Sequence, residues 1–147
     1  MAELIREFVA YEPKMKNRWL IKMTPVITSG YRSTKLEEWV YVSTNRPIYK
    51  RKRFWFFWSR LEIEPIWVEM TDPISPSSTT VIYKLIKDDS KIDYELEILD
   101  PTGVAIEKWE LKGCEILEVD FGRLNYSDND TMICKLLIKP KKVKLLF

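Results

Sequence analysis

The sequence predicts a single mostly-β domain that carries one packed helix. Short segments in which apolar and polar residues alternate recur along the chain, and this period of two is typical of strands with one buried face. A helical period is clear at one internal place only. The 147 residues contain no repeats, low-complexity segments or linkers, so residues 1–147 fit one domain with a substantial core.

The N-terminal third predicts a short helix and then two strands. Apolar residues recur on one helical face before Pro13, and the proline ends that helix. Strands are expected over 18–27 and 37–44, where β-branched and aromatic residues are frequent. Residues 45–53 are polar and contain a proline, so we expect them to form a connection.

A further strand region is expected over residues 54–70. Leu61 and Ile63 alternate with glutamates, which predicts a half-buried strand with one face in water. Pro65 cannot donate a hydrogen bond to a neighbouring strand, so we expect it at a bulge or at a sheet edge.

The period changes to a helical one between residues 71 and 89. After two prolines, Ser77 or Ser78 can cap a helix that continues to Lys87. The predicted buried face of this helix consists of Val81, Ile82, Leu85 and Ile86.

The C-terminal half predicts strands that are separated by clear turns. The expected elements are a strand over 92–99, a turn over 100–103, strands over 104–113 and 114–121, a loop over 125–130 and a strand over 131–140. In the first of these strands Ile92, Tyr94, Leu96 and Ile98 share one side, and acidic residues occupy the other. Pro101 and Gly103 favour the turn that follows.

The charge balance argues against a partner that is held mainly by electrostatic attraction. The chain has 24 Lys and Arg residues and 22 Asp and Glu residues, which gives a net charge of +2. Nucleic-acid modules usually carry a broad basic face, because phosphate neutralisation supplies much of their affinity. Here the basic and acidic residues are interspersed, except in one short run.

No catalytic, metal-binding or cofactor-binding residues are predicted. The chain has no histidine, which removes the commonest general base and the commonest metal ligand. It has neither a phosphate-binding glycine loop nor a nucleophile-elbow motif. The segment SDND, residues 127–130, lacks the glycine and the final glutamate of a calcium loop. We therefore expect no enzymatic activity, no cofactor and no metal.

Cys114 and Cys134 lie in apolar runs without a CxxC spacing, so we interpret them as small buried thiols. A disulfide between them is the alternative, and it would imply an oxidising compartment. The N-terminal residues contain no apolar signal core, and no run approaches the length of a membrane span. We therefore expect the protein in the cytosol when it is made.

The segment IYKRKRFWFFWSR, residues 48–60, is the most unusual part of the chain. Four consecutive cations are followed by five consecutive aromatic residues. Cations beside aromatic rings suit a groove for single-stranded nucleic acid, because cations follow phosphates and rings stack on bases. A small β-barrel that binds single-stranded nucleic acid is therefore one functional hypothesis, and burial of the aromatic residues in a core is another.

The whole chain resembles the tail tube proteins of contractile-tailed phages in the order of its elements. The similarity is strongest over residues 92–139, where a strand closing on ELKG leads through FGRLNYSDND into a last strand. KNRWLIKM is similar to the opening strand of that family, and TTVIYKLIKDD falls where the family has its helix. The fold is shared with the inner tube proteins of injection systems.

This resemblance implies a tail-tube-type β-barrel or sandwich and a structural function in the virion. Family members form hexameric rings in which strands of all subunits join into one barrel, and the rings stack into a tube for genome passage. The implied partners are further copies of the chain, the tail sheath and the baseplate. DNA would pass through the lumen without specific binding, and the tail would be assembled in the host cytoplasm. A baseplate-proximal tube initiator of the same fold is the alternative.

The resemblance also assigns a role to the basic and aromatic segment. Residues 45–58 fall where the family has a long hairpin arm that reaches a neighbouring subunit or ring, so the aromatic residues would be buried there. The cations from Lys50 to Arg53 would pair with acidic groups across the junction between rings. The interface candidates are Arg46, Tyr49, Lys50, Arg51, Lys52, Arg53, Phe54, Trp55, Phe57 and Trp58. A channel for DNA should be acidic or neutral, and the candidates for its wall are Asp93, Glu95, Glu97 and Glu107.

Overall fold

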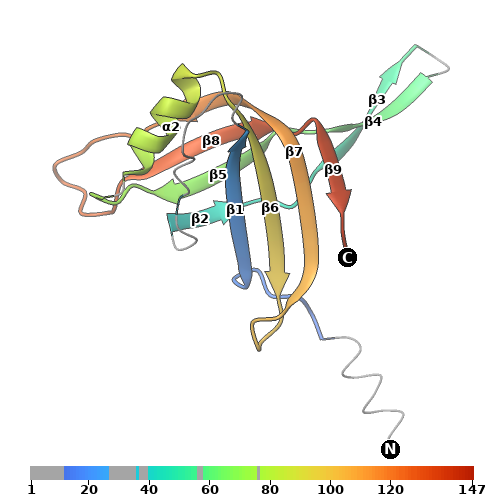
Figure 1. The fold of residues 1–147 in the computed structure, drawn as a ribbon, viewed down its shortest axis with the longest axis horizontal. Coiled ribbons are helices and arrows are strands. Elements are labelled where there is room, and N and C mark those ends of the chain that lie inside the picture. The colour runs from blue at the N-terminus through green and yellow to red at the C-terminus, as the bar shows by residue number, and fades with distance from the viewer. Residues whose placement is uncertain (1–11, 27–35, 37–39, 56–57, 76) are drawn as a thin grey trace, which may run out of the picture.

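The computed structural model describes residues 12–26, 36, 40–55, 58–75 and 77–147 (Figure 1). The predicted N-terminal helix and residues 37–39 of the second predicted strand lie outside these ranges. The described elements are β1 (Trp19–Val26), β2 (Tyr41–Thr44), β3 (Tyr49–Phe54), β4 (Trp58–Ile63), β5 (Ile66–Thr71), α2 (Ser78–Lys87), β6 (Lys91–Leu99), β7 (Ala105–Asp120), β8 (Ile133–Lys139) and β9 (Lys142–Leu145). The predicted mostly-β fold with one packed helix is confirmed for the described residues.

The main sheet has the strand order β1–β6–β7–β8–β5–β2, with β9 beside β7, and every pairing is antiparallel. Strand β7 is 16 residues long and belongs to two layers. Its first part pairs with β6 and β9, and its last part, from Glu115, pairs with β8. Figure 1 shows that β7 curves between the upright layer β1–β6–β7–β9 and the crossing layer β8–β5–β2.

The core lies between these two layers. The alternation predicted for β6 is confirmed, because Ile92, Tyr94, Leu96 and Ile98 are all buried. They face buried side chains of β5 and β8, among which Val68, Met70, Leu136 and Ile138 are inaccessible to solvent. The hydroxyl of Tyr94 lies 2.7 Å from Thr44 Oγ1, which links β6 to β2 across the core.

Helix α2 begins and ends where the sequence predicts. Ser77 is its N-cap, and the Ser77 hydroxyl accepts a hydrogen bond from the Thr80 backbone N–H. Val81, Ile82 and Leu85 are buried as predicted, whereas Ile86 is 41% exposed. The predicted face was one residue too wide, because a ten-residue helix packed along one side buries only a narrow stripe.

Asp72 connects α2 to the end of β5. Its carboxylate accepts hydrogen bonds from the Ser77 hydroxyl (2.9 Å), from the Thr79 backbone N–H (3.3 Å) and from the Thr79 hydroxyl. Partial burial acts to raise the pKa of Asp72, but these hydrogen bonds outweigh it and hold the pKa below its ordinary value.

We expect the Asp72→Ala variant to lose about 1–2 kcal/mol of unfolding free energy, because the Ser77 hydroxyl and the Thr79 N–H and hydroxyl then lose their common acceptor. Urea unfolding at pH 7 measures this loss. The Asp88→Ala variant, at the other end of the helix, is the matched control and should change the unfolding free energy less. An equal loss in both variants would contradict the role given to Asp72.

The structure corrects three predictions about the strands. Residues 49–54 form β3 rather than part of a polar connection. The separate strands expected over 104–113 and 114–121 are one strand, because Gly113 adopts a φ of +61° and allows a bulge without ending the pairing. Strand β9 was not predicted at all, although Val143 and Leu145 alternate with lysines there.

The region 54–70 is also different from the prediction. It contains the whole of β4 and all of β5 except Thr71, and Pro65 lies between the two strands rather than at a bulge within one strand. Leu61 is 53% exposed because β4 pairs only with β3 and extends away from the core. Among the described residues, no helix has the length and apolar character that crossing a membrane requires.

Candidate functional site

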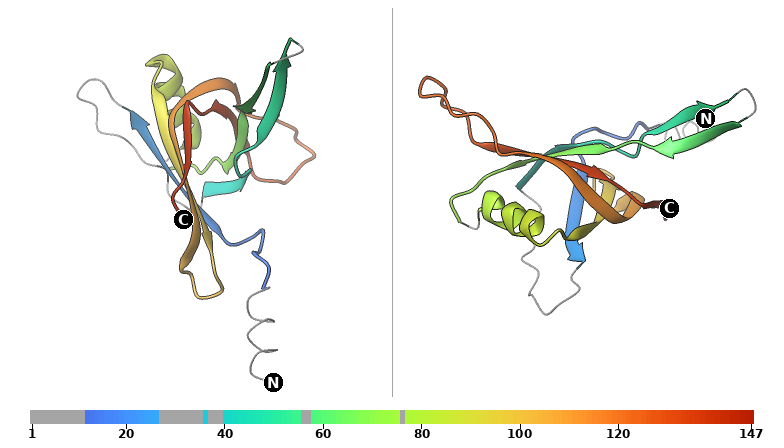
Figure 2. Two further views of the ribbon diagram at one scale, coloured as in Figure 1. Left: turned by 90° about the vertical axis from the view of Figure 1, so that its right-hand side faces the viewer. Right: turned by 90° about the horizontal axis from the view of Figure 1, so that it is seen from above.

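Strands β3 and β4 form a hairpin that projects from the body, and we call its described residues, 49–55 and 58–63, the hairpin arm (Figures 1 and 2). The register runs from Tyr49 opposite Ile63 to Phe54 opposite Trp58. Because side chains alternate along a strand, Arg51 and Arg53 share one face of the arm, and Lys50 and Lys52 share the other. The resemblance correctly indicated a long hairpin, but the arm includes β4 as far as Ile63 and so continues beyond residue 58.

One of the four cations is already paired within the arm. Lys52 Nζ lies 3.1 Å from a carboxylate oxygen of Glu62 and 3.8 Å from one of Glu64. The hydrogen bond with Glu62 is the main cause of the raised pKa of Lys52, and the charges of Glu62 and Glu64 add to it. Lys52 therefore bridges β3 and β4 at the surface of the arm, and its charge is partly balanced before any partner binds.

The other cations and the residue at the tip face solvent. Arg51 donates a hydrogen bond to Ser59 Oγ at 3.0 Å, and Lys50 and Arg53 are exposed without an ion pair among the described residues. Trp55 is 89% exposed and has a φ of +61°, which is uncommon for a residue other than glycine. Burial of this tryptophan in the core of its own chain is therefore wrong. Phe57 lies outside the described residues.

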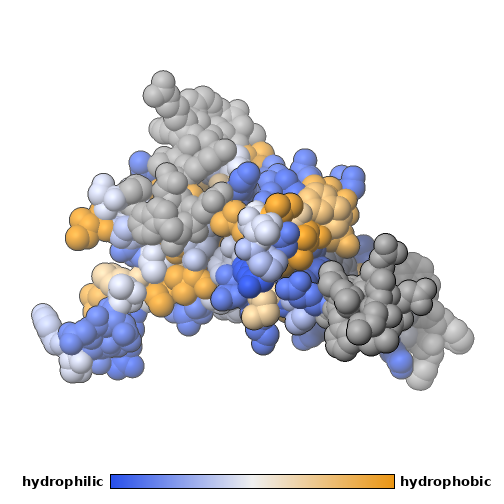
Figure 3. All heavy atoms as spheres, turned by 90° about the horizontal axis from the view of Figure 1, so that it is seen from below, coloured by the Kyte–Doolittle hydropathy of each residue, from blue (hydrophilic) through white to orange (hydrophobic). Residues whose placement is uncertain are grey.

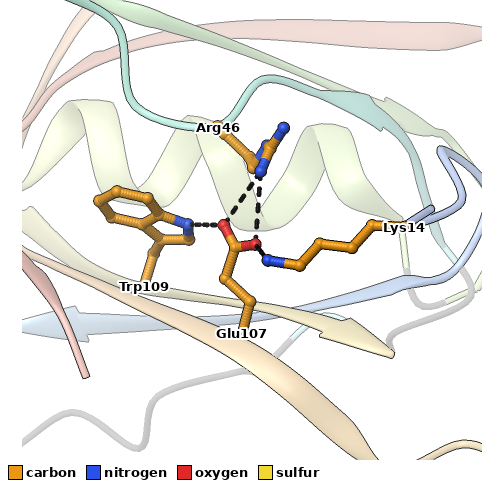
Figure 4. A network of polar contacts seen from close by, with 4 residues as sticks. All are labelled: Lys14, Arg46, Glu107 and Trp109. Atoms are coloured by element: carbon orange, nitrogen blue, oxygen red, sulfur yellow. Dashed lines mark hydrogen bonds and ion pairs between the residues drawn. The ribbon is translucent and has the colours of Figure 1, made fainter. Parts of the chain in front are cut away.

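A polar network lies at the base of the arm, around the buried carboxylate of Glu107 (Figure 4). Arg46, just before β3, donates to both carboxylate oxygens at 3.2 and 3.3 Å. Trp109 donates its indole N–H at 2.5 Å, and Lys14 forms an ion pair with the same carboxylate. Glu107 thus joins three segments that are distant in sequence: the N-terminal segment, the base of the arm and β7.

The protonation of Glu107 reflects these contacts. Burial by itself would raise its pKa, because a charged carboxylate is poorly solvated inside a protein. The hydrogen bonds from Lys14, Trp109 and Arg46 outweigh burial and lower the pKa. Glu107 is therefore a negative charge at neutral pH that pairs with Arg46 at the base of the arm.

The structure separates the four acidic residues that were grouped as candidates for a channel wall. Asp93, Glu95 and Glu97 lie on the outer face of β6, whereas Glu107 pairs in register with Ile98 on the inner face and is only 4% exposed. Grouping Glu107 with the other three was wrong. Every second residue of a strand lies on the same face, so Glu107 shares the apolar face of Trp109 and Leu111. This alternation can be seen in the sequence.

On the outer face, part of the acidic charge of β6 is paired with a lysine of β7. Lys108 Nζ lies 3.6 Å from Glu95 and 3.3 Å from Glu97, and Lys112 lies 3.0 Å from Glu110. Asp93 accepts a hydrogen bond from the Gly113 backbone N–H at 3.1 Å and so stabilises the bulge in β7. Lys108 of β7 therefore neutralises part of the acidic stripe of β6, and Lys112 pairs with an acid of its own strand.

The described part of the chain contains no group of three or more His, Cys, Asp or Glu residues that could hold a metal ion. Cys114 and Cys134 are buried free thiols, so the alternative of a disulfide between them is wrong. Burial raises the pKa of Cys114 to about 12, which keeps this thiol protonated at neutral pH.

Comparison with known proteins gives matches in fold but not in sequence. No family model and no curated protein matches the chain. A chain of the extended sheath–tube complex of an extracellular contractile injection system, PVC, matches with a TM-score of 0.67 and 9% identity, covering 95% of each chain. A chain of the six-fold symmetrised baseplate of the anti-feeding prophage matches with a TM-score of 0.62 and 12% identity, covering 92% of this chain and 96% of that one.

An Hcp1 protein of the E. coli EAEC 042 pathovar gives a TM-score of 0.61 and 9% identity, covering 88% of this chain and 91% of that one. These identities are low, so the likeness is one of fold. The agreement extends over nearly the whole length of each partner and includes components of tubes, baseplates and Hcp proteins. The chain has the tail-tube fold that Hcp proteins share with the tube proteins of contractile injection systems.

Proposed function

We propose that this chain is a structural subunit of the tube of a contractile tail or injection machine. The observation that carries the proposal is the fold match, which extends over 95% of this chain and 95% of a chain from a sheath–tube complex. In this function the chain forms rings of six copies, and the rings stack around a channel. The six-fold symmetry of the similar baseplate supports that number.

The layer β1–β6–β7–β9 supports assembly through its edges. Among the described residues, β1 has a strand partner only on its β6 side, and β9 has one only on its β7 side. Because neighbours in this layer are antiparallel throughout, β1 and β9 run in opposite directions. The β9 edge of one copy and the β1 edge of the next can therefore pair as antiparallel strands, and a closed ring leaves no free strand edge in this layer.

The mixed charges on the outer face of this layer suit the wall of a channel. Lys108 of β7 pairs with Glu95 and Glu97 of β6, and Lys112 pairs with Glu110, so basic and acidic groups alternate there and form no continuous basic stripe that would retain a polyanion. In a phage virion the molecule that passes would be the genome DNA, without specific binding. Sheath and baseplate proteins are the further partners, and the assembled protein would reside in the tail after assembly in the host cytoplasm.

Sedimentation velocity over a concentration series tests the proposal. We expect the purified protein to pass from monomers to rings and longer particles as concentration rises, because each copy presents both halves of the interface. A tube initiator of the baseplate, the alternative with the same fold, would stop at single rings. A protein that stays monomeric at every concentration would count against both.

A second candidate function, binding of single-stranded nucleic acid, is favoured by one observation, the exposed Trp55 beside exposed cations. Pairing of Lys52 with Glu62 argues against it, because it reduces the free charge of the arm. Fluorescence anisotropy with a labelled oligonucleotide separates the two functions. A tube subunit should show weak binding, whereas a nucleic-acid module should bind with a steep dependence on salt.

A further inference from the structure

Two segments project from opposite ends of the molecule. Figure 1 shows the hairpin arm at one end of the longest axis and the connection between β7 and β8 at the other, and the view from above in Figure 2 agrees. We call residues 121–132 of that connection the projecting loop. None of the described residues of these two segments is buried in the hydrophobic core, and only Phe121, at the base of the projecting loop, packs against it.

The two segments carry opposite charges. The arm contains one acidic residue, Glu62, and five basic residues: Lys50, Arg51, Lys52, Arg53 and Arg60. The projecting loop contains two acidic residues, Asp128 and Asp130, and one basic residue, Arg123. The end of β7 next to the loop adds two further acidic residues, Glu118 and Asp120. All of the loop's charged residues are exposed, and in Figure 3 this end of the molecule, at the lower left, is mostly hydrophilic.

Both segments also expose large apolar side chains. Trp55 is 89% exposed at the tip of the arm, and Leu124 is 76% exposed and Tyr126 fully exposed in the projecting loop. Aromatic residues next to arginine are enriched where protein surfaces meet, because they bury a large area with little loss of side-chain freedom. Each segment therefore has the apolar centre and charged surroundings of one half of an interface.

We propose that the hairpin arm of one copy docks onto the projecting loop of a second copy. Trp55 lies against Leu124 and Tyr126 in this contact, and Arg51 and Arg53 meet Asp128 and Asp130. Since the two surfaces are different and lie at opposite ends, the contact is heterologous and joins copies head to tail. The inference rests on the proposed function, in which the second copy is a neighbouring subunit.

The positions of the sheet edges indicate which neighbour this is. Figure 1 shows β9 on the side of the layer nearer to the arm, and β1 on the side nearer to the projecting loop. A neighbour that pairs its β1 with β9 thus also presents its projecting loop towards the arm. We therefore place the arm against the next subunit of the same ring. Its cations then pair within the ring, and not across the junction between rings as the resemblance implied.

Charge exchange between two variants tests this contact. The arm variant carries Arg51→Glu and Arg53→Glu, and the loop variant carries Asp128→Lys and Asp130→Lys. All four residues are exposed, so both variants should keep the wild-type far-ultraviolet circular dichroism and melting temperature. Lys84→Glu with Lys87→Glu on α2 is the matched charge-reversal control.

Each variant alone should need a roughly tenfold or higher concentration for half-maximal assembly in sedimentation velocity, because the positions proposed to meet, 51 and 53 on the arm and 128 and 130 on the loop, then carry like charges. An equimolar mixture should restore assembly, since the reversed arm fits the reversed loop and the two unchanged surfaces still fit each other. The mixture can close only rings with an even number of copies, and six is even. The α2 control should assemble like the wild type.

The outcomes separate this inference from the proposed function. If the arm variant or the loop variant formed rings at the same concentration as the wild type, the arm–loop contact would be overturned. The proposed tube function would not be affected. Variants that fail alone and also fail as a mixture would overturn it as well. Wild-type protein that associates into open chains, with rescue in the mixture, would support the contact and contradict the ring. A monomeric wild type would contradict both.

Discussion

We expect the Glu107→Gln variant to lose about 2 kcal/mol of unfolding free energy at pH 7. The side chain of Glu107 is 6% exposed and accepts hydrogen bonds from Lys14, Arg46 and Trp109. An uncharged amide keeps the shape but weakens the charge-assisted bonds, and its NH₂ group cannot accept. Lys14 and Arg46 are 49% and 59% exposed and can turn to water, which keeps the loss below that of a fully buried ion pair.

The effect of this substitution should depend on pH in a defined direction. The pKa of Glu107 in the folded protein is lower than its ordinary value of 4.5. The carboxylate therefore contributes its full stabilisation above pH 4.5, and the contribution is lost as the pH falls through the lowered folded value. The difference in unfolding free energy between wild type and Glu107→Gln should be constant near neutral pH and shrink in acid.

Urea unfolding of both proteins at several pH values measures this difference. The contributions of the other acidic residues to the pH dependence cancel, because both proteins contain those residues. Glu110→Gln is the matched control, since Glu110 lies on the outer face and pairs only with Lys112 among the described residues. It should have a much smaller effect. A difference that stays constant into acid would show that the charge of Glu107 does not stabilise the fold.

The second large effect is expected for Tyr94→Ala, which should cost about 3–5 kcal/mol of unfolding free energy. Tyr94 is inaccessible to solvent and lies where the two layers face each other. Alanine leaves a cavity that the surrounding strands cannot fill, because β5, β6 and β8 are held in register on both sides. It also removes the hydrogen-bond partner of Thr44.

Tyr94→Phe separates these two contributions. It keeps the ring and removes only the hydroxyl, so we expect a loss of about 1 kcal/mol, partly offset because Thr44 Oγ1 also contacts the Trp67 carbonyl oxygen at 3.3 Å. Thermal and urea unfolding of the wild type, Tyr94→Ala and Tyr94→Phe measure the loss of unfolding free energy in each variant. Equal stabilities of Tyr94→Ala and Tyr94→Phe would mean that the layers are not packed around this ring.

The sequence predicts most of the fold where local patterns and packing agree. The alternation from Ile92 to Ile98 and the cap at Ser77 identify β6 and α2 directly, because each pattern states which face is buried. Strand β3 gives no such signal, since its residues 50–53 are all cations and both of its faces are exposed. A strand without a buried side cannot be recognised from alternation, and only the family resemblance indicated a hairpin there.

The candidate site was harder to predict because it depends on contacts between distant segments. Nothing in the local sequence indicates that Lys14, Arg46 and Trp109 meet at Glu107, although the period of β7 places Glu107 on the inner face. The pairing of Lys52 with Glu62 likewise follows from the register of the arm, which the sequence does not fix. The charge opposition between the arm and the projecting loop is present in the sequence, but their positions at opposite ends require the fold.

Electron microscopy of the purified protein over a concentration series tests the central claim most directly. We predict rings with a central channel whose class averages show six-fold symmetry, and stacks of these rings at higher concentration. In a reconstruction, β9 of one copy should pair with β1 of the next. Particles without a channel, or rings in which the β1 and β9 edges face solvent, would contradict the proposal that this chain builds a tube.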